Sequence, residues 1–180
     1  MQLLSQPLAS PQLIARALHL EALQDVLGDA SAGGGRCVVL TAEAGGGKSR
    51  LLQELCASPG VAGYWLLQGN CTENSADLPY ASLHDLLRRY LAPLAPQERA
   101  TALGPLAGEL VGLLPELAWG LPGMAPSANP IPELERQRLH EALMQFLVQL
   151  AATRPVLMIV EDIHWSDEAS LEFLHLLARR

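Results

Sequence analysis

One glycine-rich segment decides the fold of this chain: Ala42-Glu43-Ala44-Gly45-Gly46-Gly47-Lys48-Ser49. An apolar run at residues 37–41 precedes the segment, and a helical pattern at residues 50–55 follows it. A strand, a glycine loop and a helix in this order are typical of a phosphate-binding loop, because glycines let several backbone N–H groups point at one anion. The helix N-terminus and Lys48 add positive charge. We therefore expect a phosphate site here, with the Ser49 hydroxyl offered to a magnesium ion.

The segment departs at one position from the usual pattern G-x-x-x-x-G-K-[ST]. Ala42 stands where that pattern has its first glycine. Because alanine adopts fewer backbone conformations than glycine, we expect altered loop geometry or altered affinity. The alternative is a glycine-rich turn between a strand and a helix, with an incidental lysine and no ligand.

A second feature supports the phosphate site. The continuous apolar run at residues 156–160 ends in Glu161 and Asp162. Such a run is typical of a strand buried on both faces, and the carboxyl ends of such strands are where open α/β sheets bind ligands. One carboxylate can hold magnesium directly or through water, while its neighbour orients or deprotonates the attacking water. The alternative is a strand that ends in solvent with two charged residues.

Composition excludes several other classes of protein. The chain has 180 residues, of which 49% are hydrophobic, enough for one core of ordinary domain size. Its net charge is −7 and its basic residues form no stripe, so we expect no direct contact with nucleic acid. Three cysteines without metal or redox spacing favour a reduced, cytoplasmic setting. No signal peptide is predicted, and no apolar stretch reaches the roughly eighteen residues that span a membrane.

The pattern along the chain predicts an α/β architecture. We expect a flexible leader at residues 1–12 and one domain over 13–180, with a helical insertion at about 92–132. Strands are predicted at 36–41, 62–68 and 155–161, and helices at 17–27, 50–55, 80–91, 97–113, 133–152 and from Asp167 onward. Ser166 or Asp167 can cap the last helix. Strands that alternate with helices favour a parallel sheet with right-handed crossovers.

With these residues, the chain resembles the N-terminal ATPase module of bacterial STAND-type regulators. These AAA+-like P-loop ATPases are related to the origin-recognition ATPases and occur in LuxR-type transcriptional regulators and in some nucleotidyl cyclases. The family's loop reads G-E-A-G-I-G-K-S-R-L, against AEAGGGKSRL at residues 42–51. Its acidic motif reads D-D-[LI]-H-W-A-D-x-x-S-L, against EDIHWSDEASL at 161–171. GNC at 69–71 and LPY at 78–80 also match, and the resemblance covers about residues 13–180.

The resemblance implies a P-loop NTPase fold, a parallel sheet with flanking helices, and ATP with Mg²⁺ as cofactors. Near the adenine site the family has L-V-G-R-E, whereas residues 13–17 read LIARA, so Ala15 replaces a glycine while Arg16 remains. Lys48 would hold the β- and γ-phosphates, Ser49 and Glu161 the magnesium, and Asp162 the attacking water, with Glu161 as the second catalytic acid. The complete set expected to bind the nucleotide is Ala44, Gly45, Gly46, Gly47, Lys48, Ser49, Arg50 and Arg16.

In this class of ATPase, the loop strand lies between two strands that come later in the sequence than the acidic strand. The chain ends at Arg180, about one helix after the acid pair. We therefore expect an incomplete domain, truncated after the acidic strand and the following helix. Its partners would be ATP and its own downstream domains, and unpaired strand edges would favour self-association. Residues 1–180 by themselves should be inactive as an ATPase, because catalysis here depends on positioning.

These observations lead to one main hypothesis, ATP binding with slow hydrolysis as the nucleotide switch of a larger signalling or transcriptional regulator. One alternative is a nucleotide-independent interaction module, in which the replacements at Ala15 and Ala42 have ended ATP binding. A small-molecule kinase is a weaker alternative, because the sequence offers no basic lid segment.

Overall fold

The computed structural model describes residues 16–43, 45–75, 78–113 and 132–180. The expected leader at 1–12, Ala44 of the loop, and residues 114–131 of the expected insertion lie outside these ranges. The chain divides into two compact units, Met1–Ala62 and Gly63–Arg180, and each is described by itself. Within the described part of the chain, no helix combines the length and the apolar character needed to cross a membrane.

The first unit carries the glycine-rich segment between two helices. Helix α1 (Ala17–Ser31) contacts both α2 (Lys48–Cys56) and the short 3₁₀ helix η1 (Pro59–Val61). The predicted helix at 17–27 is confirmed but runs longer, because a single glycine, Gly28, is tolerated inside a helix. The helix ends just before Gly33, which has a left-handed φ of 97°.

The predicted strand at residues 36–41 is wrong. These residues form no regular element, and Val38 and Val39 are 48% and 74% exposed. A strand exists only where a neighbour pairs with its N–H and C=O groups. None of the described segments pairs with residues 36–41, since the described sheet contains only β1 and β2. The apolar run therefore leads into the glycine loop as an irregular segment.

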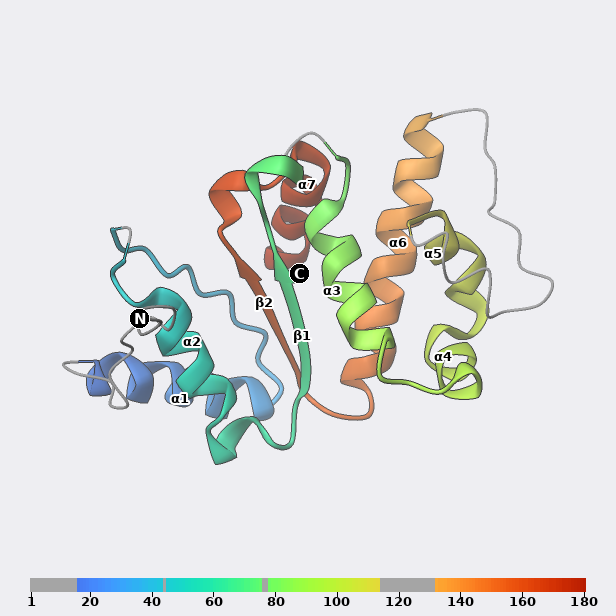
Figure 1. Ribbon diagram of the computed structural model, residues 1–180. Coiled ribbons are helices and arrows are strands. Elements are labelled where there is room, and N and C mark those ends of the chain that lie inside the picture. Colours follow the sequence, from blue (N-terminus) through green and yellow to red (C-terminus); the bar gives the residue numbers. More distant parts are fainter. Residues whose placement is uncertain (1–15, 44, 76–77, 114–131) are drawn as a thin grey trace, which may run out of the picture. The chain divides into compact units, whose positions relative to one another are not determined.

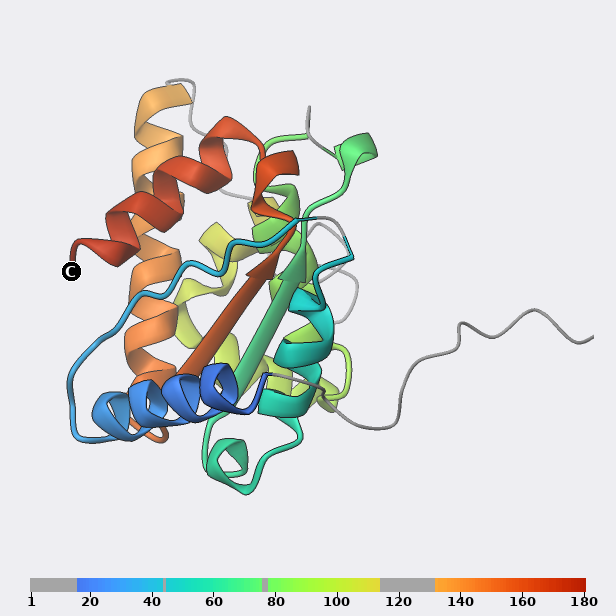
Figure 2. The ribbon, with the colours of Figure 1, turned by 90° about the vertical axis from the view of Figure 1, so that its left-hand side faces the viewer.

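The second unit is built on a parallel pair of strands. Strands β1 (Trp65–Asn70) and β2 (Val156–Glu161) pair in register, from Trp65 opposite Val156 to Asn70 opposite Glu161. Figure 2 shows both arrows pointing the same way, so the two strands end at the same edge of the sheet. The prediction of a parallel sheet is confirmed, with two described strands in place of the three that were expected.

The helices of this unit gather on one face of the sheet. Figure 1 shows α3 (Ala81–Leu91), α6 (Pro132–Ala151) and α7 (Glu168–Ala178) on that face. These three agree closely with the predicted helices. The predicted helix at 97–113 is instead α4 (Pro96–Leu103), η3 (Gly104–Leu106) and α5 (Ala107–Leu113). Gly104, with φ 52°, and Pro105 cause the break, because proline removes a helical hydrogen bond. Two more 3₁₀ helices, η2 (Glu73–Ser75) and η5 (Ile163–Trp165), follow β1 and β2.

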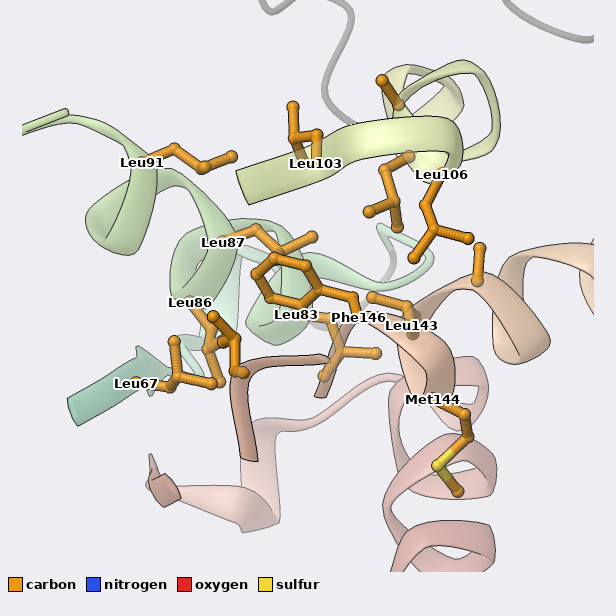
Figure 3. Close-up of a cluster of buried hydrophobic side chains, with 14 of the residues drawn as sticks. Leu67, Leu83, Leu86, Leu87, Leu91, Leu103, Leu106, Leu143, Met144 and Phe146 are labelled. Carbon is orange, nitrogen blue, oxygen red and sulfur yellow. The ribbon is translucent and has the colours of Figure 1, made fainter. Parts of the chain in front are cut away.

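The core of the second unit lies between α3, α5, α6 and β1. In Figure 3, Phe146 of α6 sits among leucines of α3, with Leu103 and Leu106 close by. Leu83, Leu86, Leu87 and Leu91 recur at helical spacing along α3 and are all buried. Gly69 lets α3 approach β1 closely, because a Cβ at this position would lie 2.5 Å from the Ser82 carbonyl oxygen. This packing fixes the carboxyl end of β2, where the acid pair lies.

Candidate functional site

The loop half of the site is shaped by two glycines. Gly45 and Gly47 have left-handed φ angles of 75° and 78°, which only glycine adopts readily. Gly47 directly precedes α2, so Lys48 and Ser49 are the first two residues of that helix. The backbone N–H groups of a first helical turn have no partner within the helix and favour an anion. The structure thus provides the turn and helix start that a phosphate loop requires.

Two cations hold the loop through its own carbonyl groups. The Lys48 ammonium donates to the Ala42 carbonyl oxygen at 3.0 Å, and the Arg16 guanidinium donates to the Gly46 carbonyl oxygen. The loop is also closed by the Gly46 N–H, which donates to the Glu43 carbonyl oxygen at 3.0 Å. The ammonium group has three donors, so a phosphate can bind Lys48 while its contact with Ala42 is kept. Arg16 ties the start of α1 to the loop.

Ala42 causes no backbone strain. Among the described residues other than glycine, only Tyr80 and Asp162 have a positive φ, so alanine at position 42 has an ordinary conformation. A Cβ added at Gly46 would lie 3.0 Å from the Ala42 Cβ and 2.9 Å from the Glu43 carbonyl oxygen. The space beside residue 42 is therefore available only because position 46 is glycine.

The remaining basic and hydroxyl groups of the loop differ in their surroundings. Ser49 is exposed and Lys48 is half-buried. Arg50, also expected at the nucleotide, forms an ion pair with Glu54 at 2.6 Å along α2. Lys48 is the single lysine among the 180 residues, and the other eleven of the twelve lysine and arginine residues are arginines. Lysine presents a compact, mobile charge with three donors, whereas the arginine fork is planar and rigid.

The acid half lies at the carboxyl edge of the sheet. Glu161 is the last residue of β2 and is half-buried, while Asp162 is exposed. The Cys71 N–H donates to the Glu161 carbonyl oxygen at 3.0 Å, which extends the strand pairing just past β1. Asp162 adopts a left-handed conformation, φ 54° and ψ 42°, that aspartate tolerates better than most residues. The chain therefore turns sharply at the acid pair and enters η5.

A buried carboxylate, that of Asp167, follows the acid pair along the chain. The Ser170 N–H donates to its carboxylate at 2.8 Å, so the prediction that Asp167 caps the last helix is confirmed. The same carboxylate also accepts hydrogen bonds from the N–H groups of Tyr80 and Ala81 at the start of α3. Sequence reasoning missed this second contact. No local pattern signals it, because Asp167 and Tyr80 are 87 residues apart.

Cys71, next to the end of β1, carries a buried thiol. Burial raises the pKa of the Cys71 thiol, and the nearby hydroxyl groups of Ser166 and Ser82 act in the opposite direction. The nearby charges of Asp167 and Asp162 add to the increase in this pKa. Cys71 therefore stays a neutral thiol at the edge of the acid half.

The described residues contain no group of three histidine, cysteine, aspartate or glutamate side chains that could hold a metal ion. Magnesium is commonly bound by one or two protein oxygens, with phosphate oxygens and water as its other ligands. An exposed Ser49 hydroxyl and a half-buried Glu161 carboxylate are donors of this kind. Each of these two side chains, taken in its own unit, has the chemistry to bind magnesium that arrives with a nucleotide.

The structure brings some of the predicted site residues together. In the first unit, Arg16 and Lys48 both contact the glycine loop. In the second unit, Glu161 and Asp162 lie at the sheet edge, next to the end of β1. These two halves belong to different compact units. Ala44 lies outside the described residues.

Comparison with known proteins gives two findings. A family model described as AAA ATPase domain matches residues 12–180. An uncharacterized protein of Rhizobium meliloti (strain 1021) is 28% identical over 180 residues, and the alignment covers 93% of this chain. The chain spans only 17% of the length of that relative. No solved structure matches the chain.

Proposed function

The chain belongs to the AAA ATPase domain family, and we propose that it binds magnesium-ATP as the nucleotide switch of a larger signalling or transcriptional regulator. The geometry of the glycine loop carries this proposal. Gly45 and Gly47 turn the backbone into the first turn of α2, where the chain's single lysine stands. A turn of this kind with a cation at the helix start favours a phosphate group.

Each half of the site contributes a distinct role. On binding, Lys48 donates to the β- and γ-phosphate oxygens beside its contact with the Ala42 carbonyl oxygen, while Arg16 stays on the Gly46 carbonyl and holds the loop. Ser49 and Glu161 would hold the magnesium, which would neutralise phosphate charge when bound. Asp162 orients the attacking water and accepts its proton. We propose slow hydrolysis, so that the nucleotide state acts as a timer in a STAND-type regulator of the LuxR class.

A second candidate is an interaction module that acts without nucleotide. It is favoured by the exposed valines at 38 and 39, which lie in a segment with no pairing strand among the described residues. An extended apolar segment of this kind can add to the sheet edge of another domain or of a second copy.

The deciding experiment measures magnesium-ATP affinity by calorimetry for wild type and Lys48→Ala. Loss of a charge-assisted phosphate contact should weaken binding by about 1.5–3 kcal/mol, which is roughly tenfold or more. Arg36→Gln is the matched control, because it removes one positive charge from the same unit at an exposed position outside the loop. Equal affinities for wild type and Lys48→Ala would contradict the loop assignment. A wild-type protein that binds no nucleotide would favour the interaction module.

The single lysine permits an independent check. An amine-selective acetylating reagent can modify only Lys48 and the N-terminal amine of this chain. We expect ATP to protect Lys48 and to leave the N-terminal amine reactive, and mass spectrometry of the peptides separates the two sites.

A further inference from the structure

One buried carboxylate in the second unit joins two helix N-termini. Asp167 is only 6% exposed, and its two oxygens accept four hydrogen bonds. Oδ1 accepts from the N–H groups of Tyr80 and Ser170, both at 2.8 Å. Oδ2 accepts from the Ala81 N–H at 3.2 Å and from the Ser170 hydroxyl at 2.6 Å. Each oxygen thus serves the start of α3 and the start of α7 together.

This arrangement exceeds what a helix cap needs. A capping side chain ordinarily accepts from the first turn of its own helix, as Asp167 does with Ser170. The additional donors come from α3, where the chain enters the helix through Tyr80 at a left-handed φ of 62°. A non-glycine residue persists in that region only where its surroundings hold it there. The partial positive charges of both helix N-termini stabilise the buried carboxylate.

Asp167 is separated from the acid pair by one short turn. Asp162 begins that turn at φ 54°, and η5 fills it, with Trp165 N–H donating to the Asp162 carbonyl oxygen at 2.9 Å. On the other side, the Cys71 N–H holds the Glu161 carbonyl oxygen. The acid pair therefore lies between two anchors, the end of β1 and the Asp167 carboxylate. The second anchor also fixes the start of α3, which packs on β1.

We propose that Asp167 is a positioning residue for the acid pair, in which Glu161 would hold the magnesium and Asp162 would orient the attacking water. The proposal rests on the proposed function, because it assigns a role in the site that binds the metal. Asp167 acts through the turn at residues 162–166 and touches no ligand, since its oxygens are buried and occupied by four protein donors. Removing the Asp167 carboxylate removes the support of the left-handed residues Tyr80 and Asp162. The carboxylates of Glu161 and Asp162 then lose their fixed positions.

The test compares ATP affinity with and without magnesium for wild type and Asp167→Asn. Asparagine keeps one acceptor oxygen but places an NH₂ group opposite the Ala81 N–H and the Ser170 hydroxyl. We expect the factor by which magnesium strengthens ATP binding to fall on the order of tenfold, the usual scale for a residue that orients a metal ligand. Affinity for ATP without magnesium should stay unchanged, because the phosphate loop belongs to the other compact unit.

Two further variants separate positioning from simple capping. Ser170→Ala removes one hydrogen bond from Oδ2 and leaves the three backbone donors, so the magnesium effect should stay within about twofold of wild type. Asp167→Ser keeps a good cap for α7 but is too short to reach α3, so it should lose the magnesium effect as Asp167→Asn does. Asp167→Ser also provides the test if the asparagine variant does not fold.

The outcomes distinguish this inference from the proposed function. If wild type binds ATP more tightly with magnesium and both Asp167 variants keep the full effect, Asp167 is a cap only and the inference is overturned. If the Asp167 variants lose affinity equally with and without magnesium, the effect is general and the inference is also overturned. If wild type binds no ATP at all, the proposed function fails, and the inference fails with it. Faster amide exchange at residues 162–166 in Asp167→Asn, together with the lost magnesium effect, supports the inference.

Discussion

In the loop half, the left-handed backbone positions are glycines, Gly45 and Gly47, whereas in the acid half they are Tyr80 and Asp162. Glycine adopts this conformation without help, so the loop needs few contacts and is held mainly by Lys48 and Arg16 on its own carbonyls. Tyrosine and aspartate need support, and the acid half has it in the strand pairing and in buried Asp167. Local sequence thus determines the loop, and long-range packing determines the acid half.

The largest expected effect is on the free energy of unfolding of the second unit, whose core supports the acid pair. Phe146 is 1% exposed and lies against α3, so Phe146→Ala should lower the free energy of unfolding by about 3–5 kcal/mol through lost burial and a cavity. Urea unfolding followed by tryptophan fluorescence measures this change, since Trp65 and Trp165 both belong to the second unit. Val148→Ala, two residues further along α6 and 68% exposed, is the control and should cost under about 0.5 kcal/mol. Equal costs for both variants would show that Phe146 does not anchor the core.

The same contrast explains what the sequence could and could not predict. The glycine loop and the start of α2 are local features, and the leucines of α3 recur at helical spacing, so both are predictable from the sequence. The break at Gly104-Pro105 was also present in the sequence as a turn signal, yet the length of the apolar pattern concealed it.

Two other features had no local signal. Whether residues 36–41 form a strand depends on a pairing neighbour, which an apolar run does not reveal. The bond from Tyr80 to Asp167 joins residues 87 positions apart, so only the nearer partner, Ser170, was predictable as part of a helix cap. The residues of the acid pair could be named from the sequence, but the contacts that hold them could not.

In the glycine loop, the addition of a single methyl group should be enough to weaken nucleotide binding. Gly46→Ala places a methyl group 2.9 Å from the Glu43 carbonyl oxygen, so the loop must shift, and magnesium-ATP binding should weaken by about 1–3 kcal/mol. Calorimetry measures the change. Gly28→Ala is the matched control, because a Cβ there meets nothing within 4 Å and Gly28 lies in α1 of the same unit. Unchanged affinity in Gly46→Ala would mean that the loop adjusts at no cost, and that glycine at position 46 is not needed for its binding conformation.

Acid should affect the second unit through His140. Burial lowers the pKa of His140, and its Nε2 lies 3.2 Å from the Tyr80 hydroxyl oxygen, whose own pKa burial raises to about 12. Glu172 and Arg136 also face His140, the first raising its pKa and the second lowering it. The unfolded chain thus binds a proton more readily than the folded protein, so stability falls as pH decreases below about 6.5.

The pH effect is measured as the free energy of unfolding from pH 8 to pH 5. His140→Gln should flatten the decrease, because the group that takes up the proton is gone. His175→Gln, at an exposed position on α7, should leave the decrease as in wild type. A decrease that is unchanged in His140→Gln would assign the acid sensitivity to other groups.

The smallest expected effect is that of Ala42→Gly, which restores the residue of the usual loop pattern. Ala42 already has an ordinary φ, so glycine relieves no strain, and magnesium-ATP affinity should stay within about twofold or improve. The contact between positions 42 and 46 makes a sharper test possible. Because the Ala42 Cβ is one of the two nearest of the three atoms that a new Cβ at position 46 would meet, Ala42→Gly combined with Gly46→Ala should recover part of the affinity lost in Gly46→Ala alone. Recovery should be incomplete, since the Glu43 carbonyl oxygen remains in place. A clear loss of affinity in Ala42→Gly would instead show that the loop has adapted to alanine, and that its shape is not determined by its glycines alone.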